Sequence, residues 1–240
     1  MSAPARVVVH PGKQALADGA AARLVLALQD VQTARETVHI SATGGSMGSA
    51  LWAAVAHSPL RDLVDWSHVH VWWGDERYLP AGDPDRNDTQ NDAAGLAALG
   101  LPPQNVHRVA GPDTSASPEA SALAYGEELR AAGSGAWDVM ILGVGPDGHV
   151  ASLFPGHPAQ LSAEAIAVAV HDSPKPPPTR VSLTLECLAR SQRVWFIVAG
   201  ADKAEAVRNG LAGAAPEIST AAQVHGDAET LWLLDADAAG

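Results

Sequence analysis

Two residues in one glycine-rich turn have the types and the spacing for acid–base chemistry. Asp147 and His149 lie two positions apart, shortly after the apolar run Asp138–Leu142. A histidine titrates near neutral pH, and a neighbouring carboxylate orients the imidazole and increases its basicity. The spacing therefore predicts that His149 acts as a general base that activates water, with Asp147 as its partner.

The same turn formally contains the pattern G-x-G-x-x-G of dinucleotide-binding sites, within residues 143–148. Asp147 would place a carboxylate inside the pyrophosphate loop, and Pro155 and Pro158 interrupt the helix that should follow. Asp172, near the end of the next predicted strand, still offers a substitute for the ribose-binding acid of such sites. The pattern thus disfavours a dinucleotide site and favours a turn that presents Asp147 and His149.

A second loop, Thr43-Gly44-Gly45-Ser46, has the features of an anion site. It follows a predicted strand and opens a predicted helix, so free backbone amides and the positive end of the helix dipole are available there. Paired glycines allow a ligand to approach the chain closely, and the two hydroxyl groups add donors. The loop predicts a phosphate or sulfate site; the alternative is an ordinary tight turn between a strand and a helix.

Three consecutive charged residues, Asp75, Glu76 and Arg77, follow an apolar run that ends in Trp72 and Trp73. Ligands of open parallel sheets gather at such strand ends. Arg77 either pairs with one of the two carboxylates or reaches an anionic or carbonyl oxygen in the cleft. The two tryptophans are predicted to belong to the core.

The remaining candidate cations are dispersed along an acidic chain. Lys175 and Arg180 flank a proline run, and Lys203 lies where a predicted strand passes into a helix. The chain has 15 lysines and arginines against 27 aspartates and glutamates, a formal net charge of −12, which disfavours a nucleic-acid-binding surface. Cations at strand-to-helix junctions of such a chain predict a local anion pocket; the alternative is a solvated surface position for each.

Apolar runs that alternate with helical patterns must position these residues. Helical spacing of apolar residues appears within 16–28, and further helices are predicted at 47–57, 87–99, 118–132 and 202–211. Strands separated by helices imply crossover connections, hence an α/β fold with a mainly parallel sheet and helices on both faces. The predicted strands are Val7–Val9, Val38–Ala42, Val69–Trp73, Asp138–Leu142, Ala165–Val170, Val194–Ala199 and Leu231–Leu234.

Composition and loops suggest one cytoplasmic domain over residues 1–240. The stretches 79–86, 155–160 and 172–178 are predicted to be irregular, and the last is better explained as a stiff surface loop than as a linker. Cys187 is the only cysteine, so the chain forms no internal disulfide; we expect an inert buried thiol and a reducing compartment. The N-terminus lacks a signal-peptide pattern, and no run is long enough to span a membrane.

Taken together, these motifs resemble the 6-phosphogluconolactonase family in order and in spacing. The resemblance covers nearly the whole chain. It is carried by Gly44-Gly45-Ser46, Trp73-Gly74-Asp75-Glu76-Arg77 with Pro80 and Asn87, Leu142 to His149, Ser152-Leu153-Phe154-Pro155, Lys175-Pro176, Arg180 to Thr184, and Gly200 to Ala204.

The resemblance implies a Rossmann-like α/β fold shared with glucosamine-6-phosphate deaminases and a hydrolase without cofactor or metal. The implied reaction is hydrolysis of 6-phospho-D-glucono-1,5-lactone to 6-phosphogluconate in the oxidative pentose phosphate pathway. It assigns Gly44, Gly45 and Ser46 to the substrate phosphate, His149 to the general base and Asp147 to its partner. It further makes Arg77, Arg180 and Lys203 substrate contacts, with Arg77 or Arg180 as the donor to the oxyanion.

Two positions depart from the family pattern, and two alternative functions stay open. Met47-Gly48 stands where Thr-Pro is usual, and Asp88 where an aromatic residue is common. The alternatives are an amino-sugar-phosphate deaminase or isomerase and a non-catalytic sugar-phosphate-binding module. Against the first, Phe154 occupies the position of the glutamate that deaminases carry seven residues after the aspartate. The expected partner is a small phosphosugar lactone, with neither nucleic acid nor membrane; a monomer is compatible with the sequence, which leaves the oligomeric state open.

Overall fold

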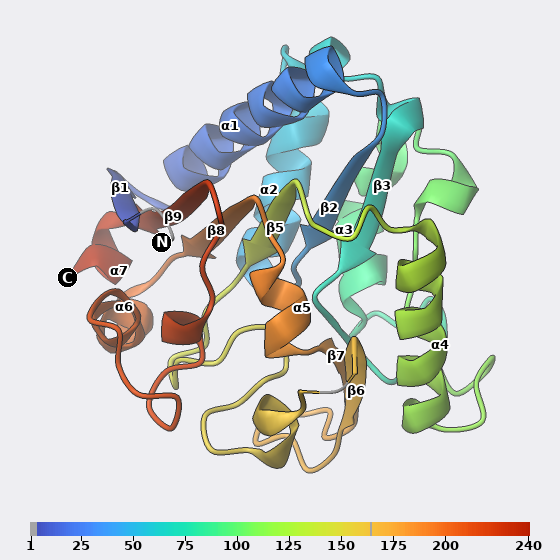
Figure 1. The fold of residues 1–240 in the computed structure, drawn as a ribbon. Helices are drawn as coiled ribbons and strands as arrows, with labels where there is room; N and C mark the ends of the chain where they lie inside the picture. The colour runs from blue at the N-terminus through green and yellow to red at the C-terminus, as the bar shows by residue number, and fades with distance from the viewer. Residues whose placement is uncertain (1–3, 164) are drawn as a thin grey trace.

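The computed structural model describes residues 4–163 and 165–240 and contains a six-stranded sheet (Figure 1). The strand order is β1-β9-β8-β5-β2-β3, and every neighbouring pair is parallel. The predicted parallel α/β fold is therefore confirmed. The strands are β1 (Arg6–His10), β2 (Val38–Ala42), β3 (Val69–Trp73), β5 (Val139–Leu142), β8 (Arg193–Val198) and β9 (Glu229–Asp235).

Alternate side chains of β5, β8 and β9 enter two separate hydrophobic layers. Val139 and Ile141 of β5 pack in one layer with helices α1 and α2, and Met140 and Leu142 pack in the other with α4, α5 and α6. Both faces of the sheet are thus covered, as parallel strands require. The helices are α1 (Lys13–Ala34), α2 (Gly45–His57), α3 (Asn87–Ala94), α4 (Pro118–Ala132), α5 (Leu185–Ala189), α6 (Ala204–Leu211) and α7 (Ala236–Ala239).

Two predicted helices are shorter than expected. The segment 87–99 divides at Gly95, whose φ of 147° ends α3 before a 3-10 turn at Leu96–Leu99. The segment 202–211 begins with a 3-10 turn at Ala201–Lys203 and becomes α-helical at Ala204. Helices α5 and α7 were not predicted, because neither is long enough to show a helical period.

A second, antiparallel sheet corrects the prediction for the segment 165–170. That strand, β6 (Ala167–Val170), does not join the main sheet but pairs with β7 (Arg180–Leu183), which pairs with β4 (Asp75–Arg77). The reason is the connection from β6 to β7: the proline-rich loop 172–178 contains no crossover helix, and parallel neighbours need a longer, usually helical connection. The small sheet places Asp75, Arg77 and Arg180 beside the carboxyl end of β3.

Three histidine rings lie close together at β2 and β3, and two of them, His39 and His107, are buried. The rings of His39 and His70 have centroids 4.6 Å apart, and His70 Nδ1 lies 2.9 Å from Nε2 of His107, which stacks on Trp72. Burial, together with the charges of His70 and Arg35, lowers the pKa of His39 to about 4. The folded protein therefore holds His39 neutral at pH values where the unfolded chain would protonate it.

The contribution of His39 to the stability of the fold is expected to fall as the pH drops from about 6.5 towards 4. In this pH range His39 is protonated in the unfolded state but neutral in the folded state, so acid favours unfolding. The resulting loss in the free energy of unfolding is up to roughly 3 kcal/mol. Urea unfolding at several pH values between pH 7 and pH 4.5 gives the slope of the free energy of unfolding against pH. The variant His39→Asn should flatten it, whereas the exposed His225→Asn should leave it unchanged; equal slopes in all three proteins would contradict the role of His39.

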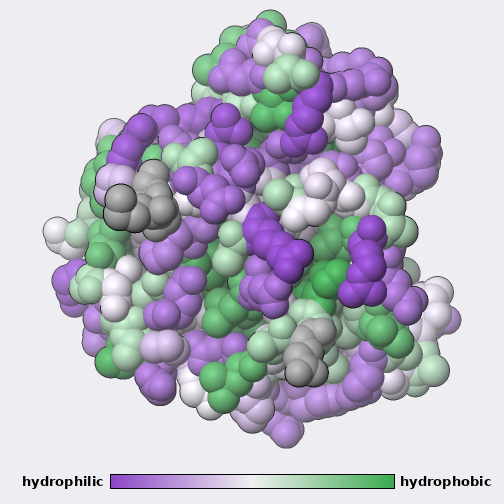
Figure 2. Space-filling view, in the orientation of Figure 1, coloured by the Kyte–Doolittle hydropathy of each residue, from purple (hydrophilic) through white to green (hydrophobic). Residues whose placement is uncertain are grey.

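The face of the molecule seen in Figure 2 carries mostly hydrophilic side chains, with an apolar hollow between α4 and α5. In residues 4–163 and 165–240, no helix has both the length and the apolar character needed to cross a bilayer.

Candidate active site

The carboxyl ends of β2, β3, β5 and β8 surround a cavity of about 320 Å³, closed on one side by the small antiparallel sheet. This is the edge where ligands of open parallel sheets bind. Asp147 contacts the cavity through His149, while Ser46 is exposed and lies outside the lining. Six of the eight predicted site residues line the cavity, namely Gly44, Gly45, Arg77, His149, Arg180 and Lys203.

The turn after β5 brings Asp147 and His149 into direct contact. Asp147 Oδ1 lies 2.5 Å from Nδ1 of His149, which leaves Nε2 as the free ring nitrogen. A Cβ on Gly145 would lie 2.0 Å from His149 Nδ1, so the pair folds back over a position that only glycine fits. Gly148 has a φ of 81°, which favours glycine, and no helix starts at this turn among the described residues. The glycines therefore make room for the acid–base pair and do not form a pyrophosphate-binding loop.

The charges around Asp147 keep its carboxylate ionised. Partial burial alone would raise the pKa of Asp147, but the hydrogen bond and charge of His149 and the charge of Lys175 hold it well below its usual range. Lys175 Nζ lies 3.3 Å from Asp147 Oδ1. The carboxylate is thus a permanent anion that orients the imidazole.

The loop between β2 and α2 has the geometry of an anion site. Gly44 caps α2 without a side-chain hydrogen bond, and Gly45 has a φ of 73°. A Cβ on Gly44 would lie 1.8 Å from Oδ1 of Asn87, so only glycine fits there. Thr43 Oγ1 accepts a hydrogen bond from the amide of Gly143, which ties this loop to the catalytic turn. The first turn of α2 therefore faces the cavity with free backbone donors.

The departure at Met47-Gly48 has a steric explanation in this loop. A Cβ on Gly48 would lie 2.1 Å from the carbonyl oxygen of Thr43. Glycine at this position allows the first turn of α2 to approach Thr43 more closely than any other residue would, while Met47 is buried in the core.

Arg77 and Arg180 are neighbours across the small sheet. They are register partners of β4 and β7, and both line the cavity. Arg77 Nη1 donates to the carbonyl oxygen of Asp85, and its buried Nε has no hydrogen-bond partner among the described residues. Burial and the charge of Arg77 lower the pKa of Arg180, while Asp75 opposes that shift. Two adjacent cations at the cavity wall favour an anionic ligand.

The guanidinium of Arg180 uses most of its donors within the protein. Nη2 donates to the carbonyl oxygens of Lys175 and Pro176 at 3.0 and 3.1 Å, and Nε donates to Pro177 O at 3.1 Å. Nη1 lies 3.4 Å from Ser152 Oγ and 4.0 Å from an Asp75 oxygen. Arg180 thus both lines the cavity and fastens the proline-rich loop.

The side chain of Glu76 is bound by backbone amides and does not form a salt bridge with Arg77. Its carboxylate accepts hydrogen bonds from the amides of Arg77, Asn87 and Asp88, and it lies 3.9 Å from Arg86. Burial and the neighbouring Asp88 raise the pKa of Glu76 to about 8. Glu76 therefore fixes the start of α3, and the side chain of Arg77 pairs with neither Glu76 nor Asp75 within 4.0 Å.

Asp88, the second departure from the family pattern, belongs to a buried ion pair. Arg86 Nε and Nη2 donate to its two carboxylate oxygens at 2.9 and 2.7 Å. Because Arg86 Nη1 also donates to the carbonyl oxygen of Leu79, this pair holds the loop 79–86 against α3.

Three further polar residues line the cavity: Asp75 and Asn87, to which the sequence assigned no role, and Lys175, a candidate cation of the predicted anion pocket. Asn87 Nδ2 donates to the carbonyl oxygen of Asp75 at 2.9 Å, and an Asp75 carboxylate oxygen lies 2.5 Å from Ser152 Oγ. The sequence signal for Lys175 was its place beside the proline run, which by itself does not indicate contact with a turn 26 residues away.

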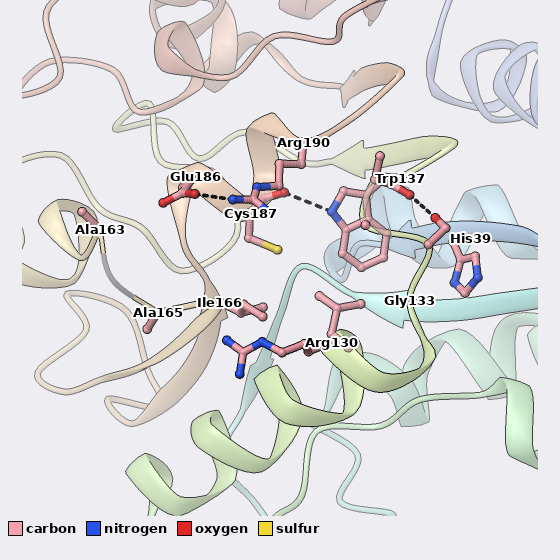
Figure 3. Close-up of a pocket in the computed structure, with 14 residues that line it drawn as sticks. His39, Arg130, Gly133, Trp137, Ala163, Ala165, Ile166, Glu186, Cys187 and Arg190 are labelled. Carbon is pink, nitrogen blue, oxygen red and sulfur yellow. Dashed lines mark hydrogen bonds and ion pairs between the residues drawn. The ribbon is translucent and has the colours of Figure 1, made fainter.

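A second cavity, of about 300 Å³, lies between α4 and α5 far along the sheet from this site (Figure 3). Cys187 and Trp137 line it, and Arg190 pairs with Glu186 at its rim. Burial raises the pKa of the Cys187 thiol to about 12, and the predicted burial of this cysteine is confirmed. Trp72 and Trp73 are fully buried, as expected. No group of three or more potential metal ligands occurs among the described residues.

Comparison with known proteins places the chain in one family. The family model described as glucosamine-6-phosphate isomerases/6-phosphogluconolactonase matches residues 11–232. The chain belongs to this family. A 6-phosphogluconolactonase from Streptomyces coelicolor is 47% identical, over 100% of this chain and 95% of the relative. One from Mycobacterium tuberculosis is 42% identical, over 97% of this chain and 96% of the relative.

Solved structures of the 6-phosphogluconolactonase group share the architecture. The 6-phosphogluconolactonase from Trypanosoma brucei has a TM-score of 0.84 at 25% identity, covering 100% of this chain and 98% of that one. A monomeric glucosamine-6-phosphate deaminase has a TM-score of 0.82 at 18% identity, over 99% of both chains, and so shares the fold alone. The family fold thus accommodates both lactone hydrolysis and deamination, and the site must distinguish them.

Proposed function

We propose that this protein hydrolyses 6-phosphogluconolactone to 6-phosphogluconate. The observation that carries the proposal is the contact between Asp147 and His149 at a cavity lined by Arg77, Arg180 and Lys203. A general base beside a cation-lined pocket suits water attack on the carbonyl of an anionic substrate. Relatives with 47% and 42% identity over nearly the whole chain carry the name 6-phosphogluconolactonase, which supports the same activity here.

The mechanism follows from the free Nε2 of His149. This nitrogen takes a proton from a water molecule, the water oxygen bonds to the lactone carbonyl carbon, and a tetrahedral oxyanion forms. Arg77, with a buried Nε that lacks a protein partner, is the favoured donor to the oxyanion. When the intermediate collapses, the bond between the carbonyl carbon and the ring oxygen breaks. The protonated His149 then donates its proton to that oxygen.

The substrate phosphate belongs at the start of α2. Gly44 and Gly45 supply free backbone donors there, and Lys203 adds a cation from the loop after β8. Among the described residues, Asp202 at 3.5 Å is the one charged partner of Lys203 Nζ, so the ammonium is available to an anion. Ser46 stays a proposed contact at the outer edge of this loop.

Phe154 favours lactone hydrolysis over deamination. Its ring is 3% exposed, and its centroid lies 4.4 Å from that of His149. An apolar ring at this position neither donates nor accepts the proton that ring opening of an amino sugar needs. The same ring packs against the imidazole and so supports a fixed orientation of the base.

The wider setting forms part of the same proposal. We propose that residues 1–240 form one domain of this family and that the protein acts in the cytoplasm, within the oxidative pentose phosphate pathway. The reaction requires neither cofactor nor metal, because the proton transfers and the charge stabilisation are all supplied by side chains named above.

Two substrates separate this function from its alternatives. With 6-phosphogluconolactone we expect 6-phosphogluconate to form faster than by spontaneous hydrolysis. With glucosamine 6-phosphate we expect no ammonia above background, because Phe154 supplies no acid or base. Ammonia production would favour a deaminase. Inactivity on both substrates would favour a sugar-phosphate-binding module.

A further inference from the structure

Lys175 makes the closest approach of any described cation to the catalytic pair. Its Nζ lies 3.3 Å from Asp147 Oδ1 and 3.4 Å from His149 Nδ1. The ammonium is therefore on the Nδ1 side of the imidazole, away from the nitrogen that faces the reacting water.

The protein holds Lys175 in this place through its backbone. Arg180 donates to the carbonyl oxygen of Lys175 at 3.0 Å, and Ser173 Oγ donates to the same oxygen at 2.9 Å. The amide of Lys175 in turn donates to Ser173 Oγ at 3.3 Å. A buried guanidinium that fastens three successive carbonyls, those of residues 175–177, fixes where the lysine side chain begins.

We propose that Lys175 is a positioning residue that sets the pH range in which His149 works as a base. The inference rests on the proposed function. The Asp147 carboxylate, 2.5 Å from Nδ1 of His149, favours the protonated imidazole, and the Lys175 ammonium, 3.4 Å from the same atom, opposes that effect. At the same time, Lys175 holds the Asp147 carboxylate in place by a charged hydrogen bond.

Other charges near the pair lie on separate elements. Arg77 and Asp75 of β4 and Arg180 of β7 line the cavity, Asp75 also accepts a hydrogen bond from Ser152 Oγ, and Lys203 lines the cavity after β8. Burial, with the charges of Lys203 and Arg180, lowers the pKa of Lys175, whereas Asp147 opposes that shift. Asp147 is the one described carboxylate within 4.0 Å of the Lys175 ammonium, so the lysine and the catalytic pair form a local unit of three titratable groups.

The test is the pH profile of Lys175→Met. We expect the acidic midpoint of kcat/KM for 6-phosphogluconolactone to rise by about one pH unit, because one nearby positive charge is lost. KM should stay within about threefold. Lys175→Arg, which keeps the charge, should have a midpoint close to that of the wild type. Lys13→Met, at an exposed position on α1, should leave the midpoint unchanged. A tenfold rise in KM with an unmoved midpoint, or no change in either, would overturn the proposal.

A measurement without substrate separates this inference from the proposed function. Nitrogen-15 NMR follows the imidazole signals of His149, identified by their loss in His149→Gln, as the pH is varied. The midpoint of that titration should rise by the same amount in Lys175→Met. If the wild type proves inactive on the lactone while this midpoint still moves, the proposed function fails and the role of Lys175 stands. An unmoved midpoint overturns the role of Lys175 whatever the activity.

Discussion

Replacing His149 by alanine is expected to lower kcat for 6-phosphogluconolactone by about 10²- to 10⁴-fold, the usual cost of losing a general base. The imidazole is the group at the cavity whose free nitrogen can take a proton from water, and Asp147 fixes that orientation at 2.5 Å. Because the base acts on the transition state, inhibition by the product 6-phosphogluconate should change by no more than a few-fold. Initial rates and product inhibition in the same buffer measure both.

Controls for this prediction come from two other residues. His225→Ala, at an exposed position outside the cavity, should retain the wild-type rate. Asp147→Asn should lose much of the activity, since an amide does not fix the imidazole tautomer as a carboxylate does. If His149→Ala kept more than about a tenth of the wild-type rate, His149 would not be the general base.

Removal of the substrate phosphate is expected to reduce kcat/KM by about 10²- to 10⁴-fold, because at least two charged hydrogen bonds, each of roughly 1.5–3 kcal/mol, are lost. A chain with a net charge of −12 repels anions overall, so the attraction must come from local groups. The start of α2 and Lys203 are those groups. Comparing unphosphorylated gluconolactone with 6-phosphogluconolactone measures the difference.

The matched variant for this prediction is Lys203→Met. This variant should lower kcat/KM for the phosphorylated lactone and leave kcat/KM for the unphosphorylated lactone unchanged. The ratio of the two kcat/KM values should therefore decrease. Lys13→Met should leave the ratio unchanged. Equal efficiency of the wild type on both lactones would contradict a phosphate site in this cavity.

The central strands of the main sheet were predictable because they are short, buried segments rich in apolar residues. The run Val38–Ala42, for example, is buried at every position. The small sheet was not predictable in the same way. Strand β4 consists of Asp75, Glu76 and Arg77, whose charges show no apolar pattern, and its carboxylates are stabilised by contacts with Ser152, Arg86 and backbone amides from elsewhere in the chain.

In the candidate site, too, some residues were predictable from local sequence and others depend on tertiary contacts. Asp147 and His149 were identifiable because one turn carries both, together with the glycines that the turn requires. Lys175 approaches them only because Arg180 fastens its loop across the cavity, and this tertiary contact leaves no local spacing in the sequence. Likewise, the donors of Arg180 are occupied by loop carbonyls, whereas its type alone predicted contact with the substrate.

Acid release from 6-phosphogluconolactone, followed at constant pH and corrected for spontaneous hydrolysis, tests the central claim most directly. The account predicts a rate that is proportional to wild-type protein concentration, ends with 6-phosphogluconate as the product, and falls to near the spontaneous rate in His149→Ala. A wild-type rate equal to spontaneous hydrolysis at every protein concentration would contradict it.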